Sequence, residues 1–410
     1  MSSTTRAGSY RAVLLLPSAL RTFVPALFGR LAYGLLPLSI LFTVHAATGS
    51  FAVAGAAGAG FGLSSLSMPF KARLVDRYSQ RVVLPPLALV CALGLVVATQ
   101  LTTPALLVAL VTVTGLFAPP LGPSMRANWR LITDDTGLKE RAYALDAICE
   151  ESLYLAGPLL AGLLISFWSA PASLICTAAL LAAGTCLMVT APLTRRTSPP
   201  SPARHPLGPL TNRGLRRILL VILVTAAGVS TAYLCIAGAA QAEGRPGAAG
   251  FVEAGIGLGS VVGGLAWGRR KHTRPAETQL AGLIGVLAVG LLAASLVSHL
   301  VVLGVVMAAF GLAVSPLFVV SYVAADELTP PDQRTEASTW INTANNLGSA
   351  AGASLTGLLI DRAGPSYGFV AGGVLLVLVS VTLLRRPTAG RWSRRPGGRS
   401  GPGPRAGRRR

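Results

Sequence analysis

The sequence of 410 residues is poor in charged side chains, which make up 12% of the chain against about 25% in an ordinary globular protein. Aromatic residues are also scarce, at 6%, whereas hydrophobic residues reach 52%. A soluble chain of this length could not bury so many apolar side chains and still cover its surface with polar groups. The hydrophobic residues recur in runs of about 20, the length that spans a bilayer core. The composition therefore excludes a soluble globular protein and predicts a multi-pass membrane protein.

Acidic residues are few as well, with 15 Asp and Glu against 35 Lys and Arg, a net charge of +20. The basic residues do not form an amphipathic face for nucleic acid. They gather in short loops and at the two chain ends, on one side of the membrane, except for Arg245 and Arg362 in opposite loops and Arg30 within a span. Such an excess is typical of cytoplasmic loops. We expect both termini in the cytoplasm, a plasma-membrane location, the lipid bilayer as surroundings and no nucleic-acid partner.

Metal-binding and catalytic motifs are missing. The five cysteines lie in apolar runs without disulfide or metal spacing, which is typical of small buried hydrophobic residues. The four histidines have no ligand spacing, and no H-E-x-x-H motif occurs. We expect no metal, no cofactor and no enzymatic activity.

Twelve apolar runs are long enough to span a bilayer. Because backbone groups in lipid must form hydrogen bonds within the chain, each run is predicted to be a helix. The fold class expected is an all-α membrane protein with twelve transmembrane helices in two six-helix halves. The spans are predicted at residues 22–45, 50–70, 82–101, 104–126, 141–166, 171–193, 217–240, 247–268, 278–297, 299–324, 336–360 and 367–385.

An internal repeat supports two like halves. Residues 141–165 align without gaps with residues 336–360, 195 positions later, and eight of the 25 positions are identical. Seven of these lie in the last ten positions. Two similar halves that rock about a central site are typical of secondary transporters.

The chain is expected to divide at two polar segments. Its parts are a cytoplasmic N-terminus at 1–21, a first half at 22–193, a linker at 194–216, a second half at 217–385 and a tail at 386–410. The linker contains five prolines and is expected to be extended and solvated. The tail, rich in Gly, Pro and Arg, is predicted to be disordered, and either attracts anionic lipid or has no role.

A charged motif follows the second span, at residues 72–84. It resembles the cytoplasmic loop motif of the major facilitator superfamily, commonly G-x-L-a-D-r-x-G-r-k-x-x-l. Ala72 and Ser79 replace the two usual glycines. The resemblance implies a gating loop whose contacts break and re-form as the halves rock. A simple positive-inside loop is the alternative, but it leaves the acidic residue unexplained. The matching residues are Leu74, Asp76, Arg77, Arg81 and Leu84.

A second motif lies in the fifth span, where Gly157, Pro158 and Gly162 match the family's antiporter motif, g-x-x-x-G-P-x-x-G-G. Leu153 and Ala161 replace two of its glycines. In the family this motif accompanies proton-coupled export. The alternative is a Gly-Pro kink that serves packing alone.

Ionisable residues inside the spans are candidates for proton coupling, since each costs about 2.5–3.5 kcal/mol to insert. Asp146 and Glu150 share one helix face. We expect Arg30 to pair with one of them and one carboxylate to carry a proton. A fixed structural ion pair is the alternative. Glu151 points about 100° away from Glu150 and is a candidate to face a wet cavity. Glu253, near the outer end of the eighth span, is a further candidate, although a carboxylate so close to the end of a span could simply reach interfacial water.

The resemblance also implies a substrate cavity lined mainly by the first, fourth, seventh and tenth helices. In the eleventh span, asparagines could bind substrate or form hydrogen bonds between helices. The substrate-cavity candidates are Arg30, Tyr33, Pro119, Pro120, Asn342 and Asn345.

These features predict a secondary active transporter of the major facilitator type, similar to bacterial twelve-helix drug/proton antiporters. The expected function is proton-coupled efflux of a small organic molecule by alternating access, with the chain acting as a monomer. The alternative is a proton symporter or facilitator that imports a nutrient such as a sugar or an organic acid. A receptor that uses the same fold without transport also remains open.

Overall fold

The computed structural model describes residues 10–133, 136–191, 209–269, 273–329 and 334–385. A few side chains within the helices also lie outside the described part, among them those of Asp76 and Glu151. Most of the predicted linker and all of the predicted tail lie outside it, so those two predictions are not tested.

The described residues form helices and their connections, without strands. In the first half the helices are α1 (Tyr10–Leu14), α2 (Ala19–Thr48), α3 (Phe51–Leu63), α4 (Met68–Tyr78), α5 (Gln80–Ala98), α6 (Pro104–Leu116), α7 (Leu121–Ile132), α8 (Lys139–Phe167) and α9 (Ala170–Met188). In the second half they are α10 (Arg213–Ala242), α11 (Ala248–Gly268), α12 (Ala276–Ala294), α13 (Leu300–Gly311), α14 (Val314–Leu328), α15 (Arg334–Ala363) and α16 (Pro365–Arg385).

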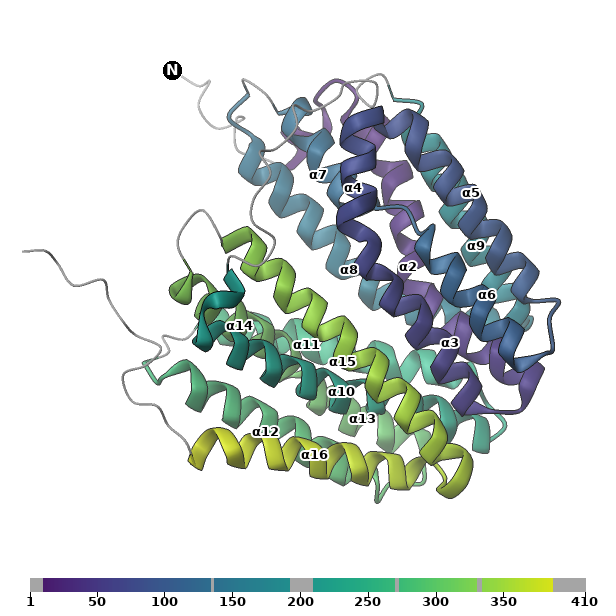
Figure 1. Cartoon of the computed structure of the whole chain (residues 1–410), viewed down its shortest axis with the longest axis vertical. Coiled ribbons are helices and arrows are strands. Elements are labelled where there is room, and N and C mark those ends of the chain that lie inside the picture. The colour runs from purple at the N-terminus through teal and green to yellow at the C-terminus, as the bar shows by residue number, and fades with distance from the viewer. Residues whose placement is uncertain (1–9, 134–135, 192–208, 270–272, 330–333, 386–410) are drawn as a thin grey trace, which may run out of the picture.

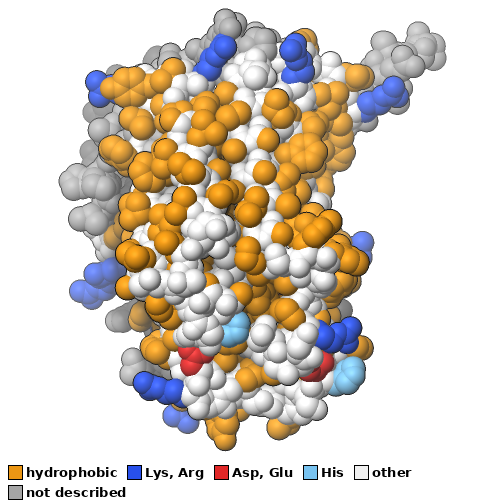
Figure 2. Space-filling view, turned by 90° about the vertical axis from the view of Figure 1, so that its right-hand side faces the viewer, with side chains coloured by type: hydrophobic (Ala, Val, Ile, Leu, Met, Phe, Trp, Pro, Cys, Tyr) orange, Lys and Arg blue, Asp and Glu red, His pale blue; other side chains and the backbone are white. Residues whose placement is uncertain are grey.

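Ten helical stretches of the described chain are long and apolar enough to cross a membrane. Two further predicted spans correspond to α15, which has 30 residues, and to α3 with α4, which a short 3-10 helix joins. The predicted all-α membrane fold is confirmed. Side chains on α5 and α12, such as Leu93 and Val289, are largely exposed, and hydrophobic groups cover most of the face in Figure 2, with charged groups towards its margins.

Several predicted boundaries differ from the helices. The fourth span is interrupted between Leu116 and Leu121, because Pro119 and Pro120 lack the N–H groups that would continue the helix. It also extends to Ile132, so Arg126 lies within α7 and not in a loop. Helix α10 begins at Arg213, within the segment predicted as linker.

The two halves form separate groups of helices (Figure 1). Helix α2 packs against α8 and α9, and α10 packs against α15 and α16. Contacts between the halves are made chiefly by α3 with α15 and by α8 with α11. We call the end of the bundle where α9 stops and α10 begins the linker end, and the opposite end, where α2 turns into α3, the far end.

Glycines bring the backbones of the two halves together. In α8, a Cβ atom at Gly162 would overlap the backbone of Gly247 and Gly250 in α11. In α15, a Cβ atom at Gly357 would overlap the backbone of Phe51 in α3. Gly357 lies 195 residues after Gly162. Equivalent glycines of the sequence repeat therefore make equivalent close contacts at the two interfaces between the halves.

The loop between α4 and α5 has a strained residue. Ser79 has φ 77° and ψ 154°, a region of backbone conformation that essentially only glycine adopts without cost. Ser79 occupies the second glycine position of the loop motif. The turn therefore keeps the glycine conformation although the glycine is absent.

Candidate functional site

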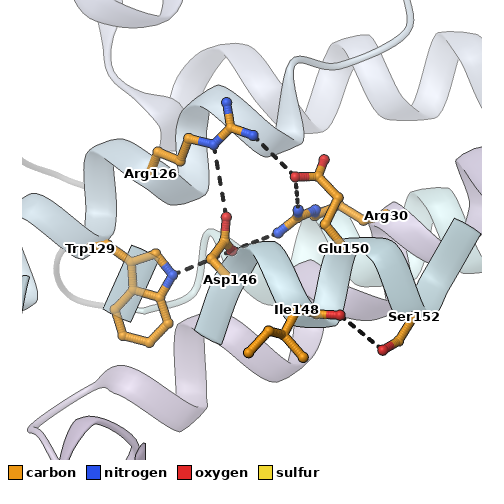
Figure 3. Close-up of polar contacts among 7 residues, drawn as sticks. All are labelled: Arg30, Arg126, Trp129, Asp146, Ile148, Glu150 and Ser152. Carbon is orange, nitrogen blue, oxygen red and sulfur yellow. Dashed lines mark hydrogen bonds and ion pairs between the residues drawn. The ribbon is translucent and has the colours of Figure 1, made fainter. Parts of the chain in front are cut away.

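A cluster of ionic side chains joins α2 and α8 in the first half (Figure 3). Arg30 Nη1 donates a hydrogen bond to Asp146 Oδ1 at 2.7 Å, and Arg30 Nη2 lies 2.8 Å from Glu150 Oε2. The side chains of Arg30 and Asp146 are 4% and 2% exposed. The expected pairing of Arg30 is confirmed, and it involves both carboxylates.

Helix α7 adds a second cation to this cluster. Arg126 Nη2 lies 3.0 Å from Glu150 Oε2, and Arg126 Nε lies 3.9 Å from Asp146 Oδ2. The indole of Trp129 also donates to Asp146 Oδ1, at 3.4 Å. Two arginines thus face two carboxylates, so the buried charges are balanced. The sequence prediction missed Arg126 because it placed this residue at the end of the fourth span, among the cations of a cytoplasmic loop.

Next to the cluster lies a pocket of about 260 Å³ that includes Arg30, Tyr33, Glu150 and the double proline among its lining residues. Tyr33 donates a hydrogen bond to the carbonyl oxygen of Pro119 at 2.6 Å. The same carbonyl oxygen also accepts a hydrogen bond from the backbone N–H of Leu121 at 2.9 Å, so Tyr33 is tied to the point where the helix is interrupted. Four of the six predicted substrate-cavity residues therefore lie together, namely Arg30, Tyr33, Pro119 and Pro120.

A larger cavity of about 310 Å³ lies between the two halves. Helices α2 and α3 line it from the first half, and α10, α11 and α15 from the second. Tyr33 lines this cavity as well as the pocket beside the ion cluster. It therefore stands between the two spaces.

Glu253 of α11 lines the cavity between the halves and is 7% exposed. Glu253 lies in the second turn of α11, near the far end of the bundle, and its side chain lines the cavity between the halves. Helix α11 packs against α8 and α13, and this packing turns Glu253 inward. It is the only charged residue among those that line the cavity in the described part of the chain.

The other polar lining groups are hydroxyls and one amide. They belong to Tyr33, Ser230, Tyr233, Asn346 and Ser349. Of the predicted asparagines, Asn342 accepts a hydrogen bond from the Tyr322 hydroxyl at 2.7 Å, and Asn345 does not line this cavity. Asn346, a third asparagine of the same span, does line it. Tyr233 was not predicted as a cavity residue, because hydropathy does not reveal which face of a buried helix lies towards the other half.

The antiporter-like motif of α8 lies at contacts with two helices. A Cβ atom at Gly157 would overlap the backbone of Gly34 in α2, and one at Gly250 in α11 would overlap the carbonyl oxygen of Pro158. Gly250 and Glu253 are three residues apart and so share a face of α11. The motif thus contacts the helix that carries Glu253, one turn away.

The loop motif is only partly described. Leu74 packs against the core, and the Arg77 guanidinium lies 5.2 Å from the ring centre of Tyr78. Arg81 is exposed, and the side chain of Asp76 is outside the described part. Close to the motif, Lys71 donates a hydrogen bond to the carbonyl oxygen of Ala118 at 2.8 Å, in the interruption between α6 and α7.

At the far end, Asp361 of α15 binds the N-terminus of α3 across the two halves. It accepts hydrogen bonds from Ser50 Oγ at 2.5 Å, from Phe51 N at 2.8 Å and from Ala52 N at 2.9 Å. The ring of His45 stacks on Phe51 with 4.0 Å between centroids. A carboxylate at a helix N-terminus is stabilised by the helix dipole and by unpaired N–H groups. We call this set of contacts the Asp361 latch.

Within the described residues, no group of three or more His, Cys, Asp or Glu could hold a metal ion. The arrangement offers instead a balanced ion cluster, an unbalanced carboxylate in a cavity and tight contacts between two halves. The two cavities leave space for a small molecule between and beside the halves.

Comparisons with known proteins agree with this geometry. Residues 22–234 and 244–408 match the family model of the Major Facilitator Superfamily. A search of curated protein sequences finds no match.

Solved structures share the fold at low identity. The crystal structure of the nucleoside transporter NupG is 14% identical, with a TM-score of 0.75, and the alignment covers 89% of this chain and 98% of that one. An auto-inhibited POT family peptide transporter is 12% identical, with a TM-score of 0.66 and coverage of 88% and 95%. The human organic anion transporter MFSD10 (TETRAN) is 19% identical, with a TM-score of 0.56 and coverage of 92% and 100%. At these identities the similarity of the structures shows the fold alone. The family assignment follows from the match of the family model over most of the chain. The chain belongs to the major facilitator superfamily and is a multi-pass membrane transporter of small molecules.

Proposed function

We propose that the protein exports a small organic molecule in exchange for protons, and that Glu253 carries the proton. The observation behind this proposal is the position of Glu253, buried in the cavity between the halves as the only charged lining residue in the described chain. A buried carboxylate without a cationic partner is stable when protonated, and becomes stable as an anion only when a cation or water reaches it. Such a group can take a proton on one side of the membrane and release it on the other.

The carboxylates of the ion cluster are less suited to this task. Asp146 and Glu150 face Arg30 and Arg126 at ion-pair distances. A carboxylate held by two cations gains little from a proton, since protonation would leave a buried cation unbalanced. We assign the cluster to holding α2, α7 and α8 together. Glu151, whose side chain is not described, remains a candidate for proton coupling from the sequence alone.

The export direction is supported by the resemblance of Gly157, Pro158 and Gly162 to the family's antiporter motif. Pro158 and Gly162 contact α11 one turn from Glu253, so movement of the halves at this interface would change the surroundings of the carboxylate. The charge distribution of the loops supports cytoplasmic termini, which makes the linker end the cytoplasmic end. We propose that the protein works in the plasma membrane as a monomer.

The test uses proteoliposomes that contain a pH-sensitive dye. Transport of a panel of cationic, neutral and anionic compounds is measured with proton gradients imposed in each direction, for the wild type, Glu253→Gln and the matched control Glu150→Gln. We expect some compounds to drive proton movement in the wild type and in Glu150→Gln, but not in Glu253→Gln.

Three results would contradict the proposal. Loss of proton movement in Glu150→Gln alone would move proton coupling to the ion cluster. Transport without proton movement would identify a facilitator, and movement of substrate and proton in the same direction would identify a symporter. Thermal unfolding in detergent checks that each variant is folded.

A further inference from the structure

The charged groups that line the cavity between the halves are of one sign only. Among its lining residues the only charge is the carboxylate of Glu253, and Lys and Arg are absent from the lining in the described chain. The remaining polar groups are neutral. Most of the wall is formed by aliphatic side chains and glycines, such as Leu36, Ile40 and Gly58.

Aromatic rings add to this character. Tyr33 and Tyr233 line the cavity from the first and second halves, in the same wall as Glu253. The hydroxyl of Tyr33 already donates to Pro119, so this residue offers the cavity its ring and not its proton. The face of a tyrosine ring attracts a cation.

Anionic ligands are disfavoured at this site. A phosphate or carboxylate group would enter an apolar space beside another carboxylate without a basic side chain to balance it. Arg30 lines the neighbouring pocket and not this cavity, and it is held by Asp146 and Glu150. A positively charged group, in contrast, would balance Glu253.

The size of the cavity limits the ligand further. About 310 Å³ is at the lower end of the range for ligand pockets. The apolar wall favours a ligand whose body is hydrocarbon, with one compact charged group.

We infer that this cavity binds an amphipathic organic cation, an amine or quaternary ammonium compound with an apolar body, and that the Glu253 carboxylate is its counter-ion. This inference rests on the proposed function and specifies its substrate class. The cation replaces the proton on Glu253 when it binds, and the proton replaces the cation when it leaves, so the charge in the cavity stays balanced. The titratable groups that line the cavity around Glu253 are Tyr33 from α2 and Tyr233 from α10, which stay neutral in both states.

The test measures binding and not transport. Purified protein in detergent is titrated with benzyltrimethylammonium by calorimetry. The neutral control is neopentylbenzene, in which carbon replaces the nitrogen, and the anionic control is benzenesulfonate. We expect the wild type to bind the cation at least about tenfold more tightly than the neutral control, and not to bind the anion. Glu253→Gln should lose this preference and keep its affinity for the neutral compound, while Glu253→Asp should retain part of the preference.

Several results would overturn the inference. They are equal affinity for the cation in the wild type and Glu253→Gln, tighter binding of the anion or the neutral compound, or no binding of the cation by folded wild-type protein. Thermal unfolding shows whether Glu253→Gln is folded, and Glu253→Asp repeats the test if it is not. Cation binding at Glu253 without proton exchange would refute only the proposed antiport, whereas proton-coupled export of neutral or anionic compounds alone would refute only the cation site.

Discussion

The two halves of the chain are built on one backbone plan but carry their charges in different places. Gly250 of α11 meets the carbonyl oxygen of Pro158, and Gly55 of α3, 195 residues earlier, meets the carbonyl oxygen of Ala353. Pro158 and Ala353 are also 195 residues apart. The same close contact thus occurs at both interfaces between the halves.

The charged residues do not follow this repeat. Position 253 is Glu where position 58 is Gly, although both line the cavity. Position 361 is Asp where position 166 is Ser. The comparison teaches that close contact between the halves depends on small residues present in both copies, whereas each polar function depends on a residue present in only one.

The largest effect is expected in the ion cluster, which only the first half has. Arg30→Gln would leave the buried Asp146 and the partly exposed Glu150 with the half-exposed Arg126 as their cation, and loss of one partner of a buried ion pair costs about 3–5 kcal/mol. Arg126→Gln removes a side chain that is 57% exposed and should cost about 0–1 kcal/mol. Thermal unfolding in detergent measures both. Thr225 occupies the position of Arg30 in the second half, so Thr225→Val is the matched control. A similar loss of stability in all three variants would contradict the expected difference between the halves.

A smaller effect is expected when the shared glycine contacts are broken. Gly162→Leu and Gly357→Leu each introduce a side chain where a Cβ atom already overlaps the backbone of the other half. Overpacking of this kind costs about 1–3 kcal/mol, and we expect both variants to lose transport to a similar extent in proteoliposomes. Gly282→Leu, at an exposed position of α12 with open space around it, should transport normally. A normal rate in only one of the two interface variants would show that the two interfaces are not equivalent.

The Asp361 latch provides the next test, because only one interface has it. Asp361→Asn removes the negative charge at the N-terminus of α3, a change worth about 1 kcal/mol, and should favour opening of the far end. Spin labels on the exposed residues Thr102 and Ser298, in a background without native cysteines, would report longer distances by electron paramagnetic resonance. Ser166→Ala should leave the distances unchanged; an identical distance distribution in Asp361→Asn would refute the role of the latch.

The smallest effect concerns the loop motif. Ser79→Gly relieves a backbone conformation that costs about 1 kcal/mol or more, but it also gives freedom to the unfolded chain. We expect a net gain in stability of roughly 0.5 kcal/mol, seen as a higher unfolding temperature. Arg274, 195 residues later, is not among the residues with positive φ, so Arg274→Gly should give no gain. A loss of stability in Ser79→Gly would contradict the strain at this turn.

The helices and the pairing of Arg30 could be predicted from the sequence because both follow from the cost of burying polar groups in lipid. Runs of apolar residues revealed the spans, and a lone arginine inside a span required an acidic partner. The inward positions of Glu253 and Tyr233 could not be predicted, since the direction in which a helix faces depends on its neighbours. The Asp361 latch could not be predicted either, because its partners lie about 310 residues away in the sequence. The sequence does not show whether a carboxylate at the end of a span is surrounded by water or by a helix N-terminus.

The backbone nature of the contacts between the halves has a consequence for how such a transporter changes over time. Since the glycine contacts use carbonyl oxygens and Cα atoms, they do not depend on the side chains that line the cavity. If the proposed substrate site is correct, a substitution at a lining position away from these contacts, as at 58 or 253, alters the cargo and leaves the packing of the halves unchanged. The residues that determine which substrate is transported and those that pack the two halves together can therefore evolve independently.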